Sequence, residues 1–375
     1  MAFPLFPCVF ERGAGGVPTT TTVALPVLPT RYEHTISDRF GFESMTMRIP
    51  VRPTTAQDWL DRGLMRSAIV YNPDGGVAWE GFAQSITATL GQKRASVSMD
   101  AIANRVRCKY TTVLDSPGTT ATASHSASQA LYGVKDMVVT LDKTTATEAA
   151  YKRDRVLTER ALPRSAETSE ARSGAAGDVT LELAFVGWYA TLAWLVFGAT
   201  STSTSSATTQ VGSFLATIAA TNPFISTSTL DIAALGRTAT QYTDADTPYR
   251  AKIEDLLGLG DTSGNPLTWG VYEGRTFRVA AWAGANPSGA GYVEQGGEAC
   301  VLLNGMRIAP WDVRPNMMST IRTFTENTSL AGTIDTGATR YIGRVTCTID
   351  GDSAGVTLEP SETSDITAQI ARLIR

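Results

Sequence analysis

Apolar and polar residues alternate with a period of two in the first and last parts of the chain. In residues 44–51 (SMTMRIPV), the side chains of Met45, Met47, Ile49 and Val51 are separated by polar residues or proline. Residues 340–349 (RYIGRVTCTI) show the same period near the other end. This period is typical of strands that bury one face. The pattern therefore predicts a β-rich fold.

Turn signals join several apolar runs into hairpins. The runs SAIVYN and VAWEGF flank Pro73-Asp74-Gly75-Gly76, and the runs LTWGVY and RTFRVAAW flank Glu273-Gly274. Pairs such as Asp-Gly supply the positive φ angles that a tight turn requires. A further turn is expected at Asn304-Gly305. Additional strands are expected over residues 82–90, 102–110 and 133–141.

Helical patterns occupy shorter segments. Val211, Phe214, Leu215 and Ile218 follow the i, i+3, i+4, i+7 spacing of one helix face. Thr145-Ala-Thr-Glu148 has the form of a capping box, which predicts the start of another helix. Three more helices are expected, beginning near Thr55, at Thr247-Pro248 and over 366–374. Strands and helices together predict an α+β, β-rich class.

The most apolar segment, residues 183–199 (LAFVGWYATLAWLVFGA), contains no charged residue. A membrane-spanning helix requires about 20 predominantly apolar residues. This segment contains Gly187, and the Ser/Thr tract that follows it has no basic anchor. The segment also continues an alternation that begins at Val179, as in a strand. A buried strand leading into a second core element is therefore favoured over a membrane span.

Composition limits the class of protein further. Lys plus Arg is 32 and Asp plus Glu is 36, so the net charge is −4, and charged residues make up 18% of the chain. This balance disfavours a broad DNA-binding surface. The 43% hydrophobic content is sufficient for folded cores. The first ten residues lack the basic start and continuous apolar stretch of a signal peptide, so no export is expected.

The cysteines and histidines do not indicate a metal site. The four cysteines, Cys8, Cys108, Cys300 and Cys347, include no CxxC pair. Reduced, buried thiols are therefore favoured over a zinc site or a disulfide framework. His34 lies in an alternating strand and His125 in a polar loop, so neither is expected to act in catalysis.

Motifs for catalysis or cofactor binding are also missing. The sequence contains neither GxSxG nor GxxxxGK followed by Ser or Thr. The neighbouring acids Asp244 and Asp246, and Asp350 and Asp352, lie in turn-like sequence, where aspartate is favoured by its own backbone hydrogen bonds. We therefore expect no enzymatic activity, no metal and no cofactor.

One charged pattern marks a candidate site. In the strand expected over 102–110, Arg105, Arg107 and Lys109 share one face, opposite Val106 and Cys108. Such a face can meet phosphate, a carboxylate-bearing partner, carboxylates of the same chain or water. The three cations are therefore the candidate residues for an interface.

Several of these segments, in this order, resemble the baseplate or tail-tip hub proteins of long-tailed bacteriophages. They are AIVYNPDGGVAWEGF followed by further strands, LYGVKDMVVTL leading into TEAAYKRDRVL, LAFVGWYATLAWLVF followed by a short helix, KIEDLLGLG with TWGVYEGRTFRVA, and the closing RYIGRVTCTIDG. The resemblance covers most of the chain from about residue 31. It concerns the shape and order of the segments and includes no catalytic signature.

The resemblance implies two tube-type β-barrel domains joined by smaller α/β segments. In the organisation that the resemblance implies, residues 1–30 form an N-terminal arm, 31–142 a first barrel, 143–178 a helix and linker, 179–260 a central α/β domain, and 261–375 a second tube-type segment with a C-terminal helix. Three copies would then present six similar barrels to a six-fold tail tube. Arg105, Arg107 and Lys109 would face the lumen or an interface.

The resemblance also implies a mechanical function in the virion. A hub closes the lower end of the tail tube, connects it to spike or fibre proteins and forms part of the DNA exit channel. The implied partners are two further copies, distal tail or tube proteins, the tape measure protein, a central spike or fibre protein and the passing genomic DNA, without stable membrane insertion. Assembly would occur in the host cytoplasm.

Three other functions are compatible with the sequence. The first is another virion structural protein, such as a distal tail or adaptor protein. The second is a carbohydrate-active β protein, which would need two acids facing each other in a cleft. The third is a receptor-binding adhesin, for which the sequence shows no repeated β-segments. No lytic extension is evident, so cell-wall cleavage is expected to belong to another protein.

Overall fold

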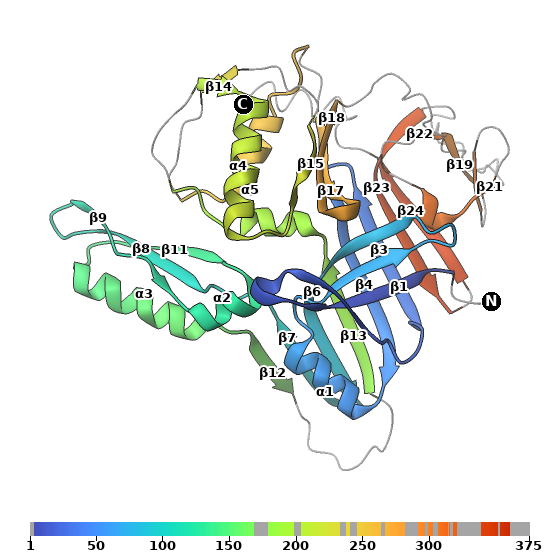
Figure 1. Cartoon of the computed structure of the whole chain (residues 1–375), viewed down its shortest axis with the longest axis horizontal. Helices are drawn as coiled ribbons and strands as arrows, with labels where there is room; N and C mark the ends of the chain where they lie inside the picture. Colours follow the sequence, from blue (N-terminus) through green and yellow to red (C-terminus); the bar gives the residue numbers. More distant parts are fainter. Residues whose placement is uncertain are drawn as a thin grey trace, which may run out of the picture.

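The computed structural model combines a wide β-sheet body, a layer of helices on one side of it and a projection that extends sideways (Figure 1). The structure describes residues 4–168, 179–198, 204–232, 238–240, 246–263, 267–281, 292–296, 299–302, 307–313, 315, 318–320, 339–351 and 353–360. The α+β, β-rich class predicted from the sequence is confirmed.

The body is built on one antiparallel series of strands. Its order is β12 (Arg164–Thr168), β7 (Lys93–Ser98), β6 (Val77–Leu90), β13 (Val179–Val186), β4 (Gly41–Val51), β3 (Arg31–Ser37), β23 (Thr339–Asp350) and β24 (Ser353–Pro360). The first half of β6 pairs with β5 (Ser67–Tyr71), which is followed by β1 (Phe6–Arg12) and β2 (Pro18–Val23). Strands from the two ends of the chain therefore share one sheet.

The period-two pattern fixes the register at the centre of this sheet. Leu183 of β13 lies opposite Met47 of β4 and Ile86 of β6, and all three side chains are fully buried. Helix α1 (Pro53–Arg62) packs against this region and buries Trp59. Full burial of a large apolar side chain contributes about 1.5–3 kcal/mol. A shift of one residue would turn these side chains to the opposite face.

The prediction of closed tube-type barrels is wrong, because the described strands form open sheets. Within the described residues, β24 pairs with β23 alone and β12 with β7 alone. A barrel requires its first and last strands to pair. Here the 14-residue strand β6 pairs with β5 along its first part and with β7 along its last part. The sheet therefore branches at β6. The expected domain boundaries stay predictions.

The helical layer contains α4 (Ala207–Thr221), α5 (Tyr249–Leu257) and the 3-10 helix η2 (Trp188–Ala193). Phe214 of α4, Tyr249 of α5 and Phe197 form a triangle with ring centroids 5.5–5.6 Å apart. Trp188 stacks on Phe224 with centroids 5.6 Å apart. Such aromatic pairs add to the stabilisation from buried area. The helix predicted from the Val211 spacing is therefore confirmed.

The remaining described elements complete the body. β14 (Thr204–Ser206) pairs with β16 (Thr238–Thr240), and β15 (Ser226–Ile232), β17 (Leu267–Tyr272) and β18 (Thr276–Ala281) lie beside the helices. Strands β19 (Tyr292–Gly296), β20 (Ala299–Leu302), β21 (Arg307–Ile308) and β22 (Met318–Thr320) extend from β23. Short 3-10 helices are η1 (Ala14–Gly16), η3 (Glu273–Arg275) and η4 (Pro310–Asp312).

The apolar run 183–199 divides between β13 and η2, which agrees with the strand interpretation. Among the described residues, no helix has the length and apolar character to cross a bilayer. The Asn304-Gly305 turn and the helix expected over 366–374 lie outside the described residues.

The projection is the part of the chain from residue 105 to residue 160. It contains β8 (Arg105–Thr111), β9 (Pro117–Thr119), β10 (Ala123–Ser124), α2 (Ser126–Tyr132), β11 (Asp136–Leu141) and α3 (Ala146–Arg160). β11 runs parallel to β8, and α3 buries Val156 against Val106 of β8. The capping box predicted at Thr145 is confirmed. Figure 1 shows these elements standing out from the body.

A short strap, residues 133–136, crosses from α2 to β11 where the projection meets the body. Gly133 ends α2 with a φ of +74°, and a Cβ atom there would lie 2.7 Å from the Phe224 ring. The amide of Val134 donates to Asn222 Oδ1 at 2.8 Å, and that of Lys135 donates to Asn104 Oδ1 at 2.8 Å. The next amide, at position 136, donates to the Trp194 carbonyl at 2.7 Å.

The carbonyl groups of Gly133, Val134 and Lys135 also have hydrogen-bond partners. The Gly133 carbonyl accepts from Asn104 Nδ2 at 2.8 Å, and the Val134 carbonyl accepts from Asn222 Nδ2 at 2.8 Å. The Lys135 carbonyl accepts from the Asn104 backbone amide at 3.0 Å. Asn104 is 0% and Asn222 1% exposed. Because an unpaired buried backbone group is costly, these two asparagines hold the projection at one position on the body.

Replacing Asn104 by alanine is expected to destabilise the protein by about 2–4 kcal/mol, because it leaves a buried carbonyl and a partly buried amide of the strap without partners. Equilibrium unfolding in urea measures this change. The control is Gln57→Ala on α1, which removes an exposed hydrogen bond to Asp61 and should change the free energy of unfolding by less than about 0.5 kcal/mol. Equal losses in the two variants would contradict the role of the strap.

Candidate functional site

The candidate cations lie on one face of β8, as the sequence predicts. Arg105, Arg107 and Lys109 alternate with Val106 and Cys108, whose side chains are 0% exposed. Burial of the apolar face against α3 fixes which way the strand faces, so the cations point to the opposite side. The three cations therefore share one face of β8 in the structure.

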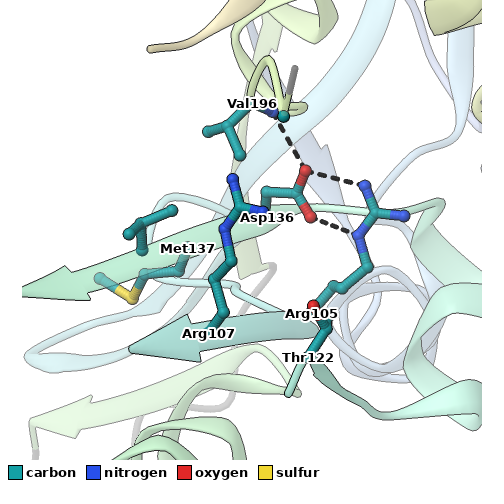
Figure 2. Close-up of a pocket in the computed structure, with 8 residues that line it drawn as sticks. Arg105, Arg107, Thr122, Asp136, Met137 and Val196 are labelled. Atoms are coloured by element: carbon teal, nitrogen blue, oxygen red, sulfur yellow. Dashed lines mark hydrogen bonds and ion pairs between the residues drawn. The ribbon is translucent and has the colours of Figure 1, made fainter. Parts of the chain in front are cut away.

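Asp136, the first residue of β11, pairs with Arg105. The parallel register places the two residues opposite each other. Arg105 Nη2 donates to Asp136 Oδ2 at 2.8 Å, and Arg105 Nε donates to the other carboxylate oxygen (Figure 2). Asp136 Oδ2 also accepts the amide of Val196 at 3.0 Å. This carboxylate therefore connects the projection to the segment that follows η2.

Asp246 pairs with the other two cations. Both Arg107 and Lys109 form ion pairs with its carboxylate, which is 9% exposed. Asp246 lies two residues before Pro248, and its amide donates to the Phe197 carbonyl at 2.8 Å. Its φ of +81° belongs to the left-handed region, which aspartate tolerates better than most residues. Two carboxylates thus oppose three cations in this cluster.

A cavity of about 330 Å³ lies against the paired arginines. Its described lining includes Asp136, Thr122, Met137 and Val196 (Figure 2). No histidine or cysteine is among these lining residues, and its one carboxylate already accepts from a guanidinium and a backbone amide. General acid–base catalysis requires a proton-carrying group free to reach a substrate. The arrangement is therefore suited to holding elements together.

The ion pairs and burial shift several pKa values at this junction. Hydrogen bonds to Asp136 raise the pKa of Arg105. Burial raises the pKa of the nearby Tyr249 hydroxyl, and the Asp136 charge acts in the same direction. Burial lowers the pKa of Lys135 to about 8. Its Nζ donates to the Met99 carbonyl at 2.7 Å and lies 5.1 Å from the Trp194 ring centroid.

Both histidines make hydrogen-bonding contacts with neighbouring residues of the fold. His34 is 1% exposed on β3, and its Nδ1 lies 2.9 Å from the Tyr32 hydroxyl. His125 caps α2, because its Nδ1 accepts the amide of Ser128 at 3.1 Å. Among the described residues, no group of three His, Cys, Asp or Glu side chains is placed to hold a metal ion.

The sequence allows carboxylates of the same chain as partners of the cations, but it does not identify which acids they are. Asp246 fits a turn, as expected, but its ion pairs with Arg107 and Lys109 join positions 139 and 137 residues apart. Asp136 begins a strand, and its pairing with Arg105 depends on the parallel register of β8 and β11. Local sequence contains no signal for either contact. Whether the cations also face a lumen or another protein stays a prediction.

Replacing Asp136 by asparagine is expected to lower the free energy of unfolding by about 2 kcal/mol, because it leaves the half-buried Arg105 guanidinium without its counter-charge. Urea unfolding at low salt measures this loss. Glu159→Gln on α3 is the control, since it breaks an exposed pair with Arg155 and should have no measurable effect. If both variants matched the wild type, the Asp136 pair would have no structural role.

The lowered pKa of Lys135 predicts a specific pH dependence. The unfolded chain has the ordinary lysine pKa of 10.5, so between about pH 8 and pH 10.5 the unfolded state binds more protons than the folded state. Stability contributed by this group therefore rises with pH over that window, by on the order of 3 kcal/mol in total. From about pH 7 to pH 10, the free energy of unfolding of the wild type should therefore rise relative to that of Lys135→Met. Parallel pH profiles would contradict the shift.

No protein-family model matches the chain, and no curated protein matches it. Among solved structures, the chain is similar to the crystal structure of the 43 kDa tail protein of prophage MuSo2 from Shewanella oneidensis, with 8% sequence identity and a TM-score of 0.44. The match covers 97% of this chain and 100% of that chain. At this identity and score, the similarity assigns neither a family nor a function.

Proposed function

We propose that the chain is a structural component of a bacteriophage tail, a hub at the tail tip or baseplate that joins the tube to spike or fibre proteins. The observation that carries the proposal is the rigid attachment of the projection to the sheet body. The strap amides at 134–136 and the strap carbonyls at 133–135 are hydrogen-bonded, and the candidate cations pair with carboxylates of the same chain. These residues hold two parts in a fixed relation, as a connector requires.

The segments that resemble hub proteins occupy defined elements, which supports the proposal. AIVYNPDGGVAWEGF forms the β5–β6 hairpin, and LYGVKDMVVTL with TEAAYKRDRVL spans the end of α2, β11 and α3. LAFVGWYATLAWLVF runs through β13 and η2, and RYIGRVTCTIDG forms β23 with the turn to β24. The segments that carry the resemblance therefore form regular strands and helices, although the expected barrels are not closed.

The open sheet gives the proposal a specific form. Among the residues that the structure describes, β24 and β12 each pair with a strand on one side only, and proteins normally cover such sheet edges. In the proposed hub, neighbouring copies complete the ring that one chain leaves open, as a homotrimer with closed symmetry. The net charge of −4 is compatible with a channel through which DNA passes without being retained.

A carbohydrate-active enzyme is less well supported. The best-placed acids are Glu33 and Glu182, which lie on the strands flanking β4 beside a cavity of about 210 Å³. Their partners are Arg31 and Arg48, at 3.8 Å and 3.5 Å. Both carboxylates are more than a third exposed, and they form ordinary surface ion pairs, one along β3 and one between β13 and β4.

Electron microscopy of particles from the strain that encodes the chain tests the proposal. Gold-labelled antibody raised against the purified chain should mark the far end of the tail. Antibody that has been absorbed with the purified chain is the control and should leave the particles unlabelled. Label on the head or along the whole tail, or absence of the chain from purified particles, would overturn the hub assignment.

A further inference from the structure

The outer end of the projection presents two large apolar side chains from a fixed turn. Val113 and Leu114, between β8 and β9, are 67% and 84% exposed. Thr112 Oγ1 accepts the amides of Leu114 and Ser116 at 3.3 Å and 3.1 Å, and the Thr112 amide donates to the Ser116 carbonyl at 2.9 Å. Asp115 follows with a φ of +60° and pairs with Lys143.

This turn, called the tip (residues 112–116), has the properties of a docking element. Its backbone is already ordered by hydrogen bonds, so binding would require little additional loss of conformational entropy. Burial of Leu114 alone would recover most of the transfer free energy of a leucine side chain. Ordered apolar side chains at a protruding end are therefore favourable anchors for a protein partner.

A groove of matching character lies elsewhere on the molecule. It has a volume of about 460 Å³ and lies between α1 and the ends of β6 and β7. Leu60, Leu90 and Ala56 provide apolar lining, and the exposed Lys93 and Arg94 lie at its side. None of the described residues that line the groove is acidic. The groove is thus apolar with a basic margin.

The charge at the end of the projection is opposite to that of the groove. Asp115, Asp142 and Glu148 are exposed there, and the cation Lys143 pairs with the first of them. The cluster therefore has an excess of negative charge beside the apolar tip. Opposite charges at the margin of an apolar contact steer association and fix its orientation.

We propose that the tip of one copy docks into the α1 groove of a second copy of this chain. Figure 1 shows β9 and α1 on different sides of the molecule, so a copy does not fill its own groove with its own tip. Contact between two different surfaces is heterologous, and it generates a ring when the rotation closes. The inference deepens the proposed function, because it names a contact that would join copies around the tail axis.

Light scattering after size-exclusion chromatography tests this contact with two double variants. One changes the tip (Val113→Asp with Leu114→Asp), and the other changes the groove margin (Lys93→Glu with Arg94→Glu). Each is expected to weaken self-association by about tenfold or more, because it removes an anchor or reverses a complementary charge. Tyr151→Asp is the control, since Tyr151 is 72% exposed on α3 outside the tip. It should retain the wild-type mass.

Mixing the two double variants makes the test specific. The tip variant keeps an intact groove and the groove variant keeps an intact tip, so the mixture should form a one-to-one dimer that cannot extend further. Far-UV circular dichroism checks that all variants remain folded. A wild type that is monomeric at its highest soluble concentration, variants with wild-type mass, or a mixture without dimer would each overturn the contact. Antibody labelling of particles tests the location on the tail separately. A failure of this contact can therefore be distinguished from a failure of the proposed function.

Discussion

Hydrogen bonding of the strap is the constraint on which the rest of the structure depends. Residues 133–136 cross between two elements at a partly buried position, where access of water to the backbone groups is reduced. Asn104 and Asn222 each donate a hydrogen bond to one strap carbonyl and accept a hydrogen bond from one strap amide. A side-chain amide provides a donor and an acceptor together, so each asparagine satisfies both kinds of group. The projection is thereby held by paired polar contacts as well as by apolar packing.

The geometry of the candidate site follows from this joint. Because the strap leads directly into β11, Asp136 begins that strand opposite Arg105 and beside the Val196 amide. The segment before α5 then brings Asp246 to Arg107 on the same strand face. Charge pairing, the cavity beside it and the shifted pKa values all arise from the meeting of the projection with the helical layer. This region therefore acts as a junction between two rigid parts.

The sequence predicts much of the local structure and little of the long-range pairing. The strand at residues 44–51, the hairpin at Asp74-Gly75 and the capping box at Thr145 depend on near neighbours, and all three are confirmed. Closure of the sheets depends on which distant strands pair, and the expectation of closed barrels is wrong. The carboxylate partners of the cations and the two strap asparagines lie far along the chain from the groups they bind, so local pattern does not reveal them.

Hydrogen–deuterium exchange at single-residue resolution tests the rigid joint most directly. The amides of Val134, Lys135 and Asp136 all donate to buried acceptors, although only the last lies in a strand. Their exchange should be as slow as that of the core amides of β6 and β13. Exchange as fast as that of the loop at residues 24–28 would contradict the account, because the projection would then move freely on the body.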